Sequence, residues 1–236
     1  MGLRDRLRVF AEECGKEVGS WVKAIFLTGP ALHWEEAPRG AEVDLLVVVD
    51  DLNMEALGRL RGVVQRWRRR LRLNPVVLSP AEMRRSLDVF PLEYARLQSQ
   101  RWLIWGEDVL EGLEVPQEAL RLQIEEELKT LLLHLRRAYL MAQGPKELGE
   151  VIRSALRHLE RLLWGLLVLK GERRPLEGET LLEGVATAYG LEGDGWLKIW
   201  ESAQARPPRG SEEALFVFLL RQVERLSDCV DRMGSP

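Results

Sequence analysis

Cysteine and histidine are scarce in this chain of 236 residues, which has two of the former and three of the latter. Cys14 and Cys229 lie far apart and outside any Cys-x-x-Cys pattern. This placement excludes a disulfide scaffold, a zinc ribbon and a thioredoxin-type redox site. His33 and His134 have no partner at the spacing of metal ligands. We therefore expect a fold stabilised without disulfides or a structural zinc ion.

Long apolar runs and a large excess of one charge are also missing. No apolar run approaches the roughly 20 residues that a membrane-spanning helix needs, and the N-terminal segment is charged and amphipathic, unlike a signal peptide. The net charge of −3 excludes a globally basic nucleic-acid binder. With 46% hydrophobic and 30% charged residues, the composition is typical of a globular protein. We expect a cytoplasmic protein of two domains that binds neither membranes nor nucleic acid.

The first half of the chain alternates between strand and helix patterns. The predicted strands cover residues 23–28, 42–50, 74–79 and 102–105. The strand that begins at Glu42 is apolar on both faces along most of its length, which is typical of a buried central strand. Apolar residues three and four apart predict helices before the first strand and after the second, and Ser79-Pro80 opens a shorter helix. Residues 1–115 are expected to form a small α/β domain.

Strand patterns disappear after residue 115. Pro116 precedes a long helical pattern, and Gly144-Pro145 separates it from a second one. Shorter helices are predicted at 178–189 and 193–203, and Pro207-Pro208 precedes a last helix. Residues 116–236 are therefore expected to form an all-α helical bundle domain, and the fold class is α+β. The apolar stripe of the last helix suits packing within the bundle or a seam of a homodimer, and the sequence leaves both open.

One constellation can carry chemistry: Thr28-Gly29-Pro30 followed by Glu42-Val43-Asp44. Strand residues two apart lie on the same face, so Glu42 and Asp44 present two carboxylates together. Such carboxylates suit Mg²⁺, which prefers hard oxygen ligands. The Gly29-Pro30 turn follows a strand and can bring backbone N–H groups to a phosphate at the same edge. Two solvated edge residues are the alternative interpretation, which the spacing taken alone favours.

These residues resemble the nucleotidyltransferase signature, in which Gly-Ser precedes an acid-apolar-acid strand. Here Gly29 is followed about a dozen residues later by Glu42-Val-Asp-Leu-Leu-Val-Val48. The superfamily includes kanamycin nucleotidyltransferase and the minimal nucleotidyltransferases of bacteria and archaea. The stretches Val89–Glu93, Trp105–Asp108 and Ala119–Gln123 are also similar to uncharacterised bacterial proteins in which a nucleotidyltransferase-like domain precedes a helical one.

The resemblance implies an N-terminal mixed sheet with flanking helices and a helical domain after it. It also implies transfer of a nucleotidyl group from an NTP, with ATP the expected nucleotide, to a hydroxyl acceptor. Glu42 and Asp44 would be the catalytic and Mg²⁺-binding residues, and Thr28, Gly29 and Pro30 would hold the nucleotide.

Three departures from the signature predict a degenerate active site. Pro30 replaces the Ser, which removes a hydroxyl and a backbone N–H donor. Glu42 is one methylene longer than Asp. The strand predicted at 74–79 supplies no third carboxylate, for which Glu82, Asp88 or Glu93 are the candidates. A non-catalytic nucleotide-binding or protein-interaction regulatory module is therefore the alternative to an enzyme.

Two further features favour structural interpretations. Seven arginines between Arg59 and Arg72 suggest an anion-binding patch, but we interpret them as the solvated side of a helix. Arg153 and His158 fit the Arg-x4–6-His pattern of HEPN-type ribonucleases. About one such match is expected by chance from the number of His and Arg residues, so we interpret this pair as surface residues of a helix.

Overall fold

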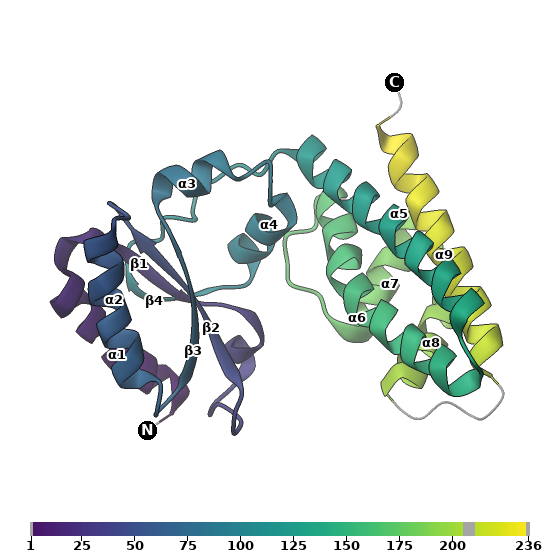
Figure 1. Cartoon of the computed structure of the whole chain (residues 1–236). Coiled ribbons are helices and arrows are strands. Elements are labelled where there is room, and N and C mark those ends of the chain that lie inside the picture. Colours follow the sequence, from purple (N-terminus) through teal and green to yellow (C-terminus); the bar gives the residue numbers. More distant parts are fainter. Residues whose placement is uncertain (1, 205–210, 235–236) are drawn as a thin grey trace. The chain divides into compact units, whose positions relative to one another are not determined.

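A computed structural model of the chain describes residues 2–204 and 211–234. The chain divides into two compact units (Figure 1). The sheet unit consists of Met1–Val89 and Glu93–Val115, and the helical unit consists of Phe90–Leu92 and Pro116–Pro236. None of the helices in the described ranges is long and apolar enough to cross a membrane. The predicted break at Pro207-Pro208 lies outside the described residues.

The sheet unit is built on a mixed sheet of four described strands in the order β3-β2-β1-β4. Its strands are β1 (Val22–Leu27), β2 (Glu42–Val49), β3 (Arg72–Leu78) and β4 (Trp102–Gly106). β1 runs antiparallel to both β2 and β4, whereas β2 and β3 are parallel. The α+β class and the mixed sheet with flanking helices, predicted from the sequence, are confirmed. Each predicted strand forms, with its ends shifted by at most two residues.

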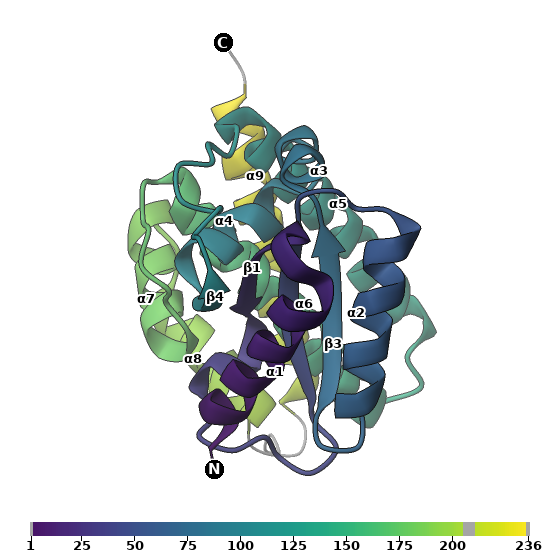
Figure 2. The same cartoon turned by 90° about the vertical axis from the view of Figure 1, so that its left-hand side faces the viewer.

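Helices α1 (Leu3–Val18) and α2 (Met54–Trp67) cover one face of the sheet (Figure 2). Their apolar stripes pack on alternate residues of β2, including Val43 and Leu45. The rings of Phe10 and Trp67 meet edge to face, with centroids 5.8 Å apart. Each buried large apolar side chain contributes about 1.5–3 kcal/mol to folding, so this core fixes which residues of β2 point toward the helices.

The other face of the sheet has a smaller apolar core. Phe26, Leu46 and Val48 pack there with residues of α3 (Pro80–Arg85) and α4 (Pro91–Ser99). Helix α4 was not predicted from the sequence. This core begins at Leu46, so the residues of the same face nearer the start of β2 are more accessible.

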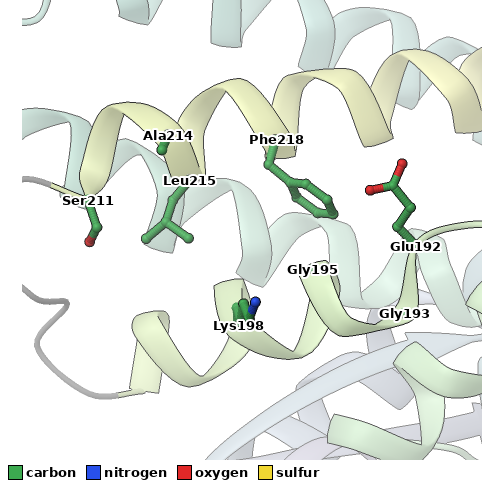
Figure 3. A pocket seen from close by; sticks show the side chains of 8 residues that line it. All are labelled: Glu192, Gly193, Gly195, Lys198, Ser211, Ala214, Leu215 and Phe218. Carbon is green, nitrogen blue, oxygen red and sulfur yellow. The ribbon is translucent and has the colours of Figure 1, made fainter.

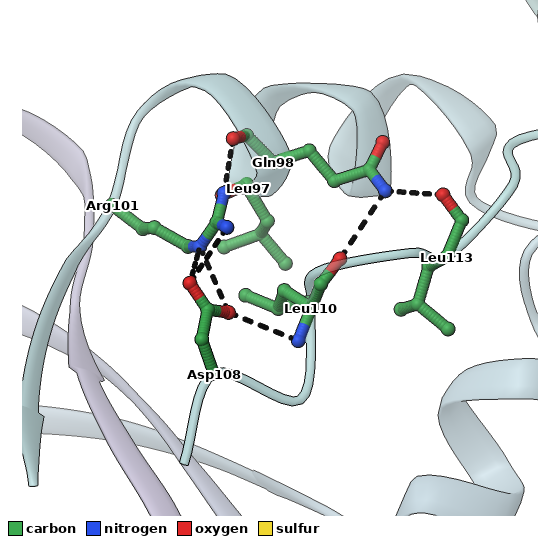
Figure 4. Close-up of polar contacts among 6 residues, drawn as sticks. All are labelled: Leu97, Gln98, Arg101, Asp108, Leu110 and Leu113. Atoms are coloured by element: carbon green, nitrogen blue, oxygen red, sulfur yellow. Dashed lines mark hydrogen bonds and ion pairs between the residues drawn. The ribbon is translucent and has the colours of Figure 1, made fainter.

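A network of polar contacts fixes the segment that follows β4 (Figure 4). Arg101 binds Asp108 through Nε–Oδ2 at 3.0 Å and Nη2–Oδ2 at 2.7 Å. Asp108 Oδ1 also accepts from the Leu110 backbone N–H at 3.1 Å, and the Gln98 amide donates to the Leu110 and Leu113 carbonyls. Because Arg101 also donates to the Leu97 and Gln98 carbonyls, this ion pair holds the segment against the end of α4.

The helical unit consists of packed helices in its described part. They are α5 (Gln117–Met141), α6 (Pro145–Leu169), α7 (Gly178–Tyr189), α8 (Gly193–Gln204) and α9 (Glu212–Met233). Helix α9 packs on α5, α6 and α8, and its stripe of Phe216, Leu219 and Val223 is buried there. The stripe is therefore used within the unit, and a homodimer through this unit stays a prediction.

Glycine is required at the end of β4. Gly106 has φ +87°, and a Cβ there would lie 1.9 Å from the Lys23 carbonyl oxygen on β1. Gly112 also has a positive φ, +79°, but a Cβ there would meet nothing within 4 Å. A side chain at Gly112 would therefore cause backbone strain alone, whereas a side chain at Gly106 would cause strain and a clash with β1.

We predict that Gly106→Ala lowers the free energy of unfolding by about 3 kcal/mol, because strain adds to the clash with β1. The matched variant Gly112→Ala is expected to lose about 1 kcal/mol, from strain alone. Urea denaturation of both variants measures the difference. Equal losses would show that the close approach of Gly106 to β1 does not constrain the sheet.

Candidate functional site

Glu42 and Asp44 lie at the start of β2, on the face that carries Leu46 and Val48 farther along the strand. Glu42 is exposed and Asp44 is half-buried. Strand alternation places the two side chains together because the intervening Val43 is buried under the helices of the opposite face. The start of β2 therefore presents two carboxylates at an accessible part of the sheet.

The turn after β1 lies against Asp44. The Thr28 backbone N–H donates to the Asp44 carbonyl at 3.0 Å. Gly29 has φ +66°, and a Cβ there would lie 2.7 Å from Asp44 Oδ2. Only glycine therefore accommodates both this backbone conformation and the approach of the carboxylate. Thr28, Gly29 and Asp44 are brought together as the motif predicts.

The turn continues into a short 3-10 helix, η2 (Gly29–His33), with Pro30 in its first turn. Pro30 is exposed and has no backbone N–H to donate. The five residues of η2 are too few to build the dipole of a long α-helix. A phosphate at this turn would therefore depend on individual backbone donors and on nearby charges.

Each carboxylate already has a protein partner on β3. Arg72 Nη2 donates to Glu42 Oε1 at 2.8 Å, and Arg72 Nη1 donates to the Gly40 carbonyl at 3.0 Å. Asn74 Nδ2 donates to Asp44 Oδ1 at 2.8 Å. Both side chains of the Glu42–Arg72 pair are more than half exposed. Such surface pairs contribute only about 0–1 kcal/mol, so a competing cation can displace Arg72 from Glu42.

These partners follow from the parallel ladder between β2 and β3, which sets Glu42 opposite Arg72 and Asp44 opposite Asn74. Sequence reasoning named neither partner. The signal that could have found them is the constant offset of 30 residues between paired positions, which becomes useful only once the two strands are known to be parallel neighbours.

The three predicted candidates for a third carboxylate lie outside the pairing of β2 with β3. Glu82 Oε2 accepts hydrogen bonds from the Ser79 backbone N–H at 2.8 Å and from the Ser79 hydroxyl at 2.9 Å, closing a capping box at the start of α3. These hydrogen bonds lower the pKa of Glu82. Asp88 is exposed before α4, and Glu93 lies in α4. In the part of the chain that the structure describes, no group of three or more His, Cys, Asp or Glu can hold a metal ion.

The HEPN-like pair lies on α6. His158 lines a hollow of about 480 Å³ between α5 and α6, together with His134 and Ser154, whereas Arg153 is not among the residues that line it. Residues five apart on an α-helix point about 140° away from each other. His158 Nε2 lies 3.4 Å from Glu127 Oε2. The structure thus does not gather Arg153 and His158 at one hollow.

A second hollow in the helical unit, of about 670 Å³, lies between α8 and α9 (Figure 3). Phe218 projects into it from α9, and a Cβ on Gly195 would lie 2.1 Å from the Phe218 ring. Glu192 and Lys198 are its charged lining residues. One charge of each sign beside an aromatic ring does not define a class of ligand.

The fold has a counterpart among solved structures. A crystal structure of a spectinomycin adenyltransferase from Enterococcus faecialis, with ATP and spectinomycin, superimposes with a TM-score of 0.51. The match covers 94% of this chain and 98% of that chain at 14% identity. This chain has a nucleotidyltransferase-like fold. Neither a protein-family model nor a curated protein sequence matches it.

We predict that Asn74→Asp makes the stability of the protein depend on divalent cations. A carboxylate opposite Asp44 replaces a hydrogen bond with repulsion, so the free energy of unfolding in EDTA is expected to fall by about 1 kcal/mol. Millimolar MgCl₂ should restore this loss by binding between the carboxylates. Urea denaturation with EDTA and with MgCl₂ measures both effects.

The control is Asn74→Ala, which removes the same hydrogen bond without adding a charge. It should be destabilised without recovery in MgCl₂. An Asn74→Asp protein that responds to MgCl₂ no more than the wild type would show that these side chains do not converge on a cation.

Proposed function

We propose that the protein is a nucleotidyltransferase with a degenerate active site, which transfers a nucleotidyl group from an NTP to a hydroxyl acceptor. The observation that carries this proposal is the Gly29 turn packed against Asp44, with Glu42 on the same face of β2. The spectinomycin adenyltransferase of similar fold was crystallised with ATP and spectinomycin, which supports ATP as the nucleotide and a small hydroxyl compound as the acceptor.

The donor set of the site fits Mg²⁺. Mg²⁺ is commonly bound through one or two protein carboxylates, with substrate phosphates and water as its other ligands. Asn74 occupies Oδ1 of Asp44, whereas Oδ2 is the oxygen beside Gly29. Within the ranges that the structure describes, Glu42 is held only by its exposed pair with Arg72. Glu42 and Asp44 would therefore hold the ion, which when bound neutralises phosphate charge and favours in-line attack at the α-phosphorus.

The residues of the chain have separate tasks in this scheme. Asn74 fixes the orientation of the Asp44 carboxylate through its hydrogen bond. Gly29 keeps the turn close to that carboxylate without a side chain between them. Pro30 contributes no N–H donor to a phosphate. We therefore expect weaker nucleotide binding and slower transfer than at a turn with serine and a third carboxylate.

A non-catalytic nucleotide-binding or protein-interaction regulatory module is the second candidate function. Two observations favour it. Asn74 places an amide opposite Asp44 where a further carboxylate would assist a metal, and Glu82 is engaged in a capping box. In such a module the same edge would bind a nucleotide weakly, without an acceptor.

Calorimetric titration with ATP and GTP, with and without Mg²⁺, tests the proposal. We expect Mg²⁺-dependent binding of ATP by the wild type and at least about tenfold weaker binding by Glu42→Ala/Asp44→Ala, because both proposed ligands are removed. The matched control is Glu111→Ala/Glu114→Ala, which removes two exposed carboxylates of the same unit. It should bind as the wild type does.

Pyrophosphate release with spectinomycin as the first acceptor then separates the two candidates. Release that depends on the acceptor and is lost in the Glu42→Ala/Asp44→Ala variant supports the transferase. Binding without release under any acceptor supports the regulatory module. If neither nucleotide binds any variant, the nucleotide site is rejected.

A further inference from the structure

A basic hollow lies at the edge of the sheet unit, beside β3. One stripe at the C-terminal end of α2 consists of residues three or four apart: Arg61, Val64, Gln65 and Arg68. With Glu42, Arg72 and Leu73 these residues line a hollow of about 390 Å³. It is therefore a concave site, and not a flat row of charges.

The positive charge in this hollow is not balanced. Within the described residues, the guanidinium groups of Arg61 and Arg68 have no hydrogen-bond or ion-pair partner, and Arg72 is paired with Glu42. The C-terminal end of α2 adds the equivalent of roughly half a negative charge. The hollow thus has three positive guanidinium groups, one negative carboxylate and about half a negative charge from the helix end. The sum is an excess of about 1.5 positive charges.

Three neighbouring arginines of the same run are engaged elsewhere. Arg59 pairs with Glu55 at 2.7 Å, and Arg66 pairs with Glu17 at 3.1 Å. The Arg70 guanidinium lies over the Trp67 ring, 5.3 Å from its centroid. Within α2 and its C-cap, the uncompensated charge therefore lies on the lining of the hollow, and Arg69, beyond the end of the helix, is the other arginine of the run without a partner among the described residues. All seven arginines of the run are exposed, as expected of a solvated surface.

We infer that this hollow binds a compact phosphate-bearing anion of the pyrophosphate class. Guanidinium groups match phosphate oxygens with two parallel N–H donors each, and the Gln65 amide adds a neutral donor. A nucleic-acid backbone would need a basic stripe several phosphates long, whereas Arg59 and Arg66 are paired with carboxylates and the chain as a whole carries −3. The concave shape and the local charge both favour a small ligand.

Glu42 connects this hollow to the proposed nucleotide site. An anion that engages Arg72 competes with Glu42 for the same guanidinium group, and so releases the Glu42 carboxylate. This connection rests on the proposed function, because Glu42 serves there as a Mg²⁺ ligand. It predicts opposite effects for one variant. Glu42→Gln should strengthen pyrophosphate binding by about threefold to tenfold and should weaken Mg²⁺-dependent ATP binding.

The test is calorimetric titration of the full chain with sodium pyrophosphate in EDTA at low ionic strength, so that no cation takes part. We expect Arg61→Gln/Arg68→Gln to weaken binding by about twentyfold or more, because two charged donors are lost. The matched control is Arg69→Gln, which removes another arginine that has no partner among the described residues and does not line the hollow. It should change binding by less than about twofold.

Each outcome decides the proposal. If Arg69→Gln and the double variant lost pyrophosphate affinity equally, the attraction would be diffuse and the proposal would be overturned. Absence of pyrophosphate binding by the wild type would also overturn the proposal. Tighter binding of a single-stranded oligoribonucleotide than of pyrophosphate, through Arg61 and Arg68, would replace it with a nucleic-acid site. Failure of only the Mg²⁺-dependent ATP titration would reject the proposed function and leave this anion site standing. Circular dichroism verifies that the variants are folded.

Discussion

The parallel pairing of β2 with β3 is the constraint on which the rest of the sheet unit depends. It joins residues 42–48 to residues 72–78 in continuous register. A slip by one residue would turn the buried Val43 and Leu45 away from the helices and expose them. The apolar core therefore determines the register, and the register in turn sets Arg72 opposite Glu42 and Asn74 opposite Asp44. The polar chemistry of the edge is a consequence of apolar packing on the opposite face.

The exposed Glu42–Arg72 pair links the two sites proposed at this edge. The Glu42–Arg72 pair is exposed on both sides and contributes little to stability. It nevertheless joins a carboxylate of the proposed cation site to a guanidinium group of the basic hollow. In the proposed scheme a cation would bind Glu42 and an anion would bind Arg72, because this exposed pair costs little to break. The Arg101–Asp108 pair is less exposed and makes further hydrogen bonds to the backbone, so an exchange of partners there would disturb the segment that it holds.

The sequence supports the fold more strongly than the site, for physical reasons. The apolar run after Asp44 requires burial on both faces, so the central strand and the α+β class were predictable and are confirmed. Hydrophobic periodicity carries no information about which strands pair or in what register, and so the partners Arg72 and Asn74 were not found. The arginine run illustrates the same limit, because periodicity places Arg61 and Arg66 on the surface alike. Only tertiary contacts decide that Arg66 is neutralised by Glu17 while Arg61 is not.

The amide at position 74 explains how this edge tolerates its two acids without a cation. Arg72 compensates Glu42, and Asn74 donates to Asp44 without adding a charge. With a third carboxylate in place of the amide, repulsion within the cluster would have to be offset by a bound metal. The present residues leave roughly one uncompensated negative charge, which solvent at an accessible edge can stabilise. An amide in place of a third carboxylate therefore lowers the repulsion at this edge and removes one possible ligand for a cation.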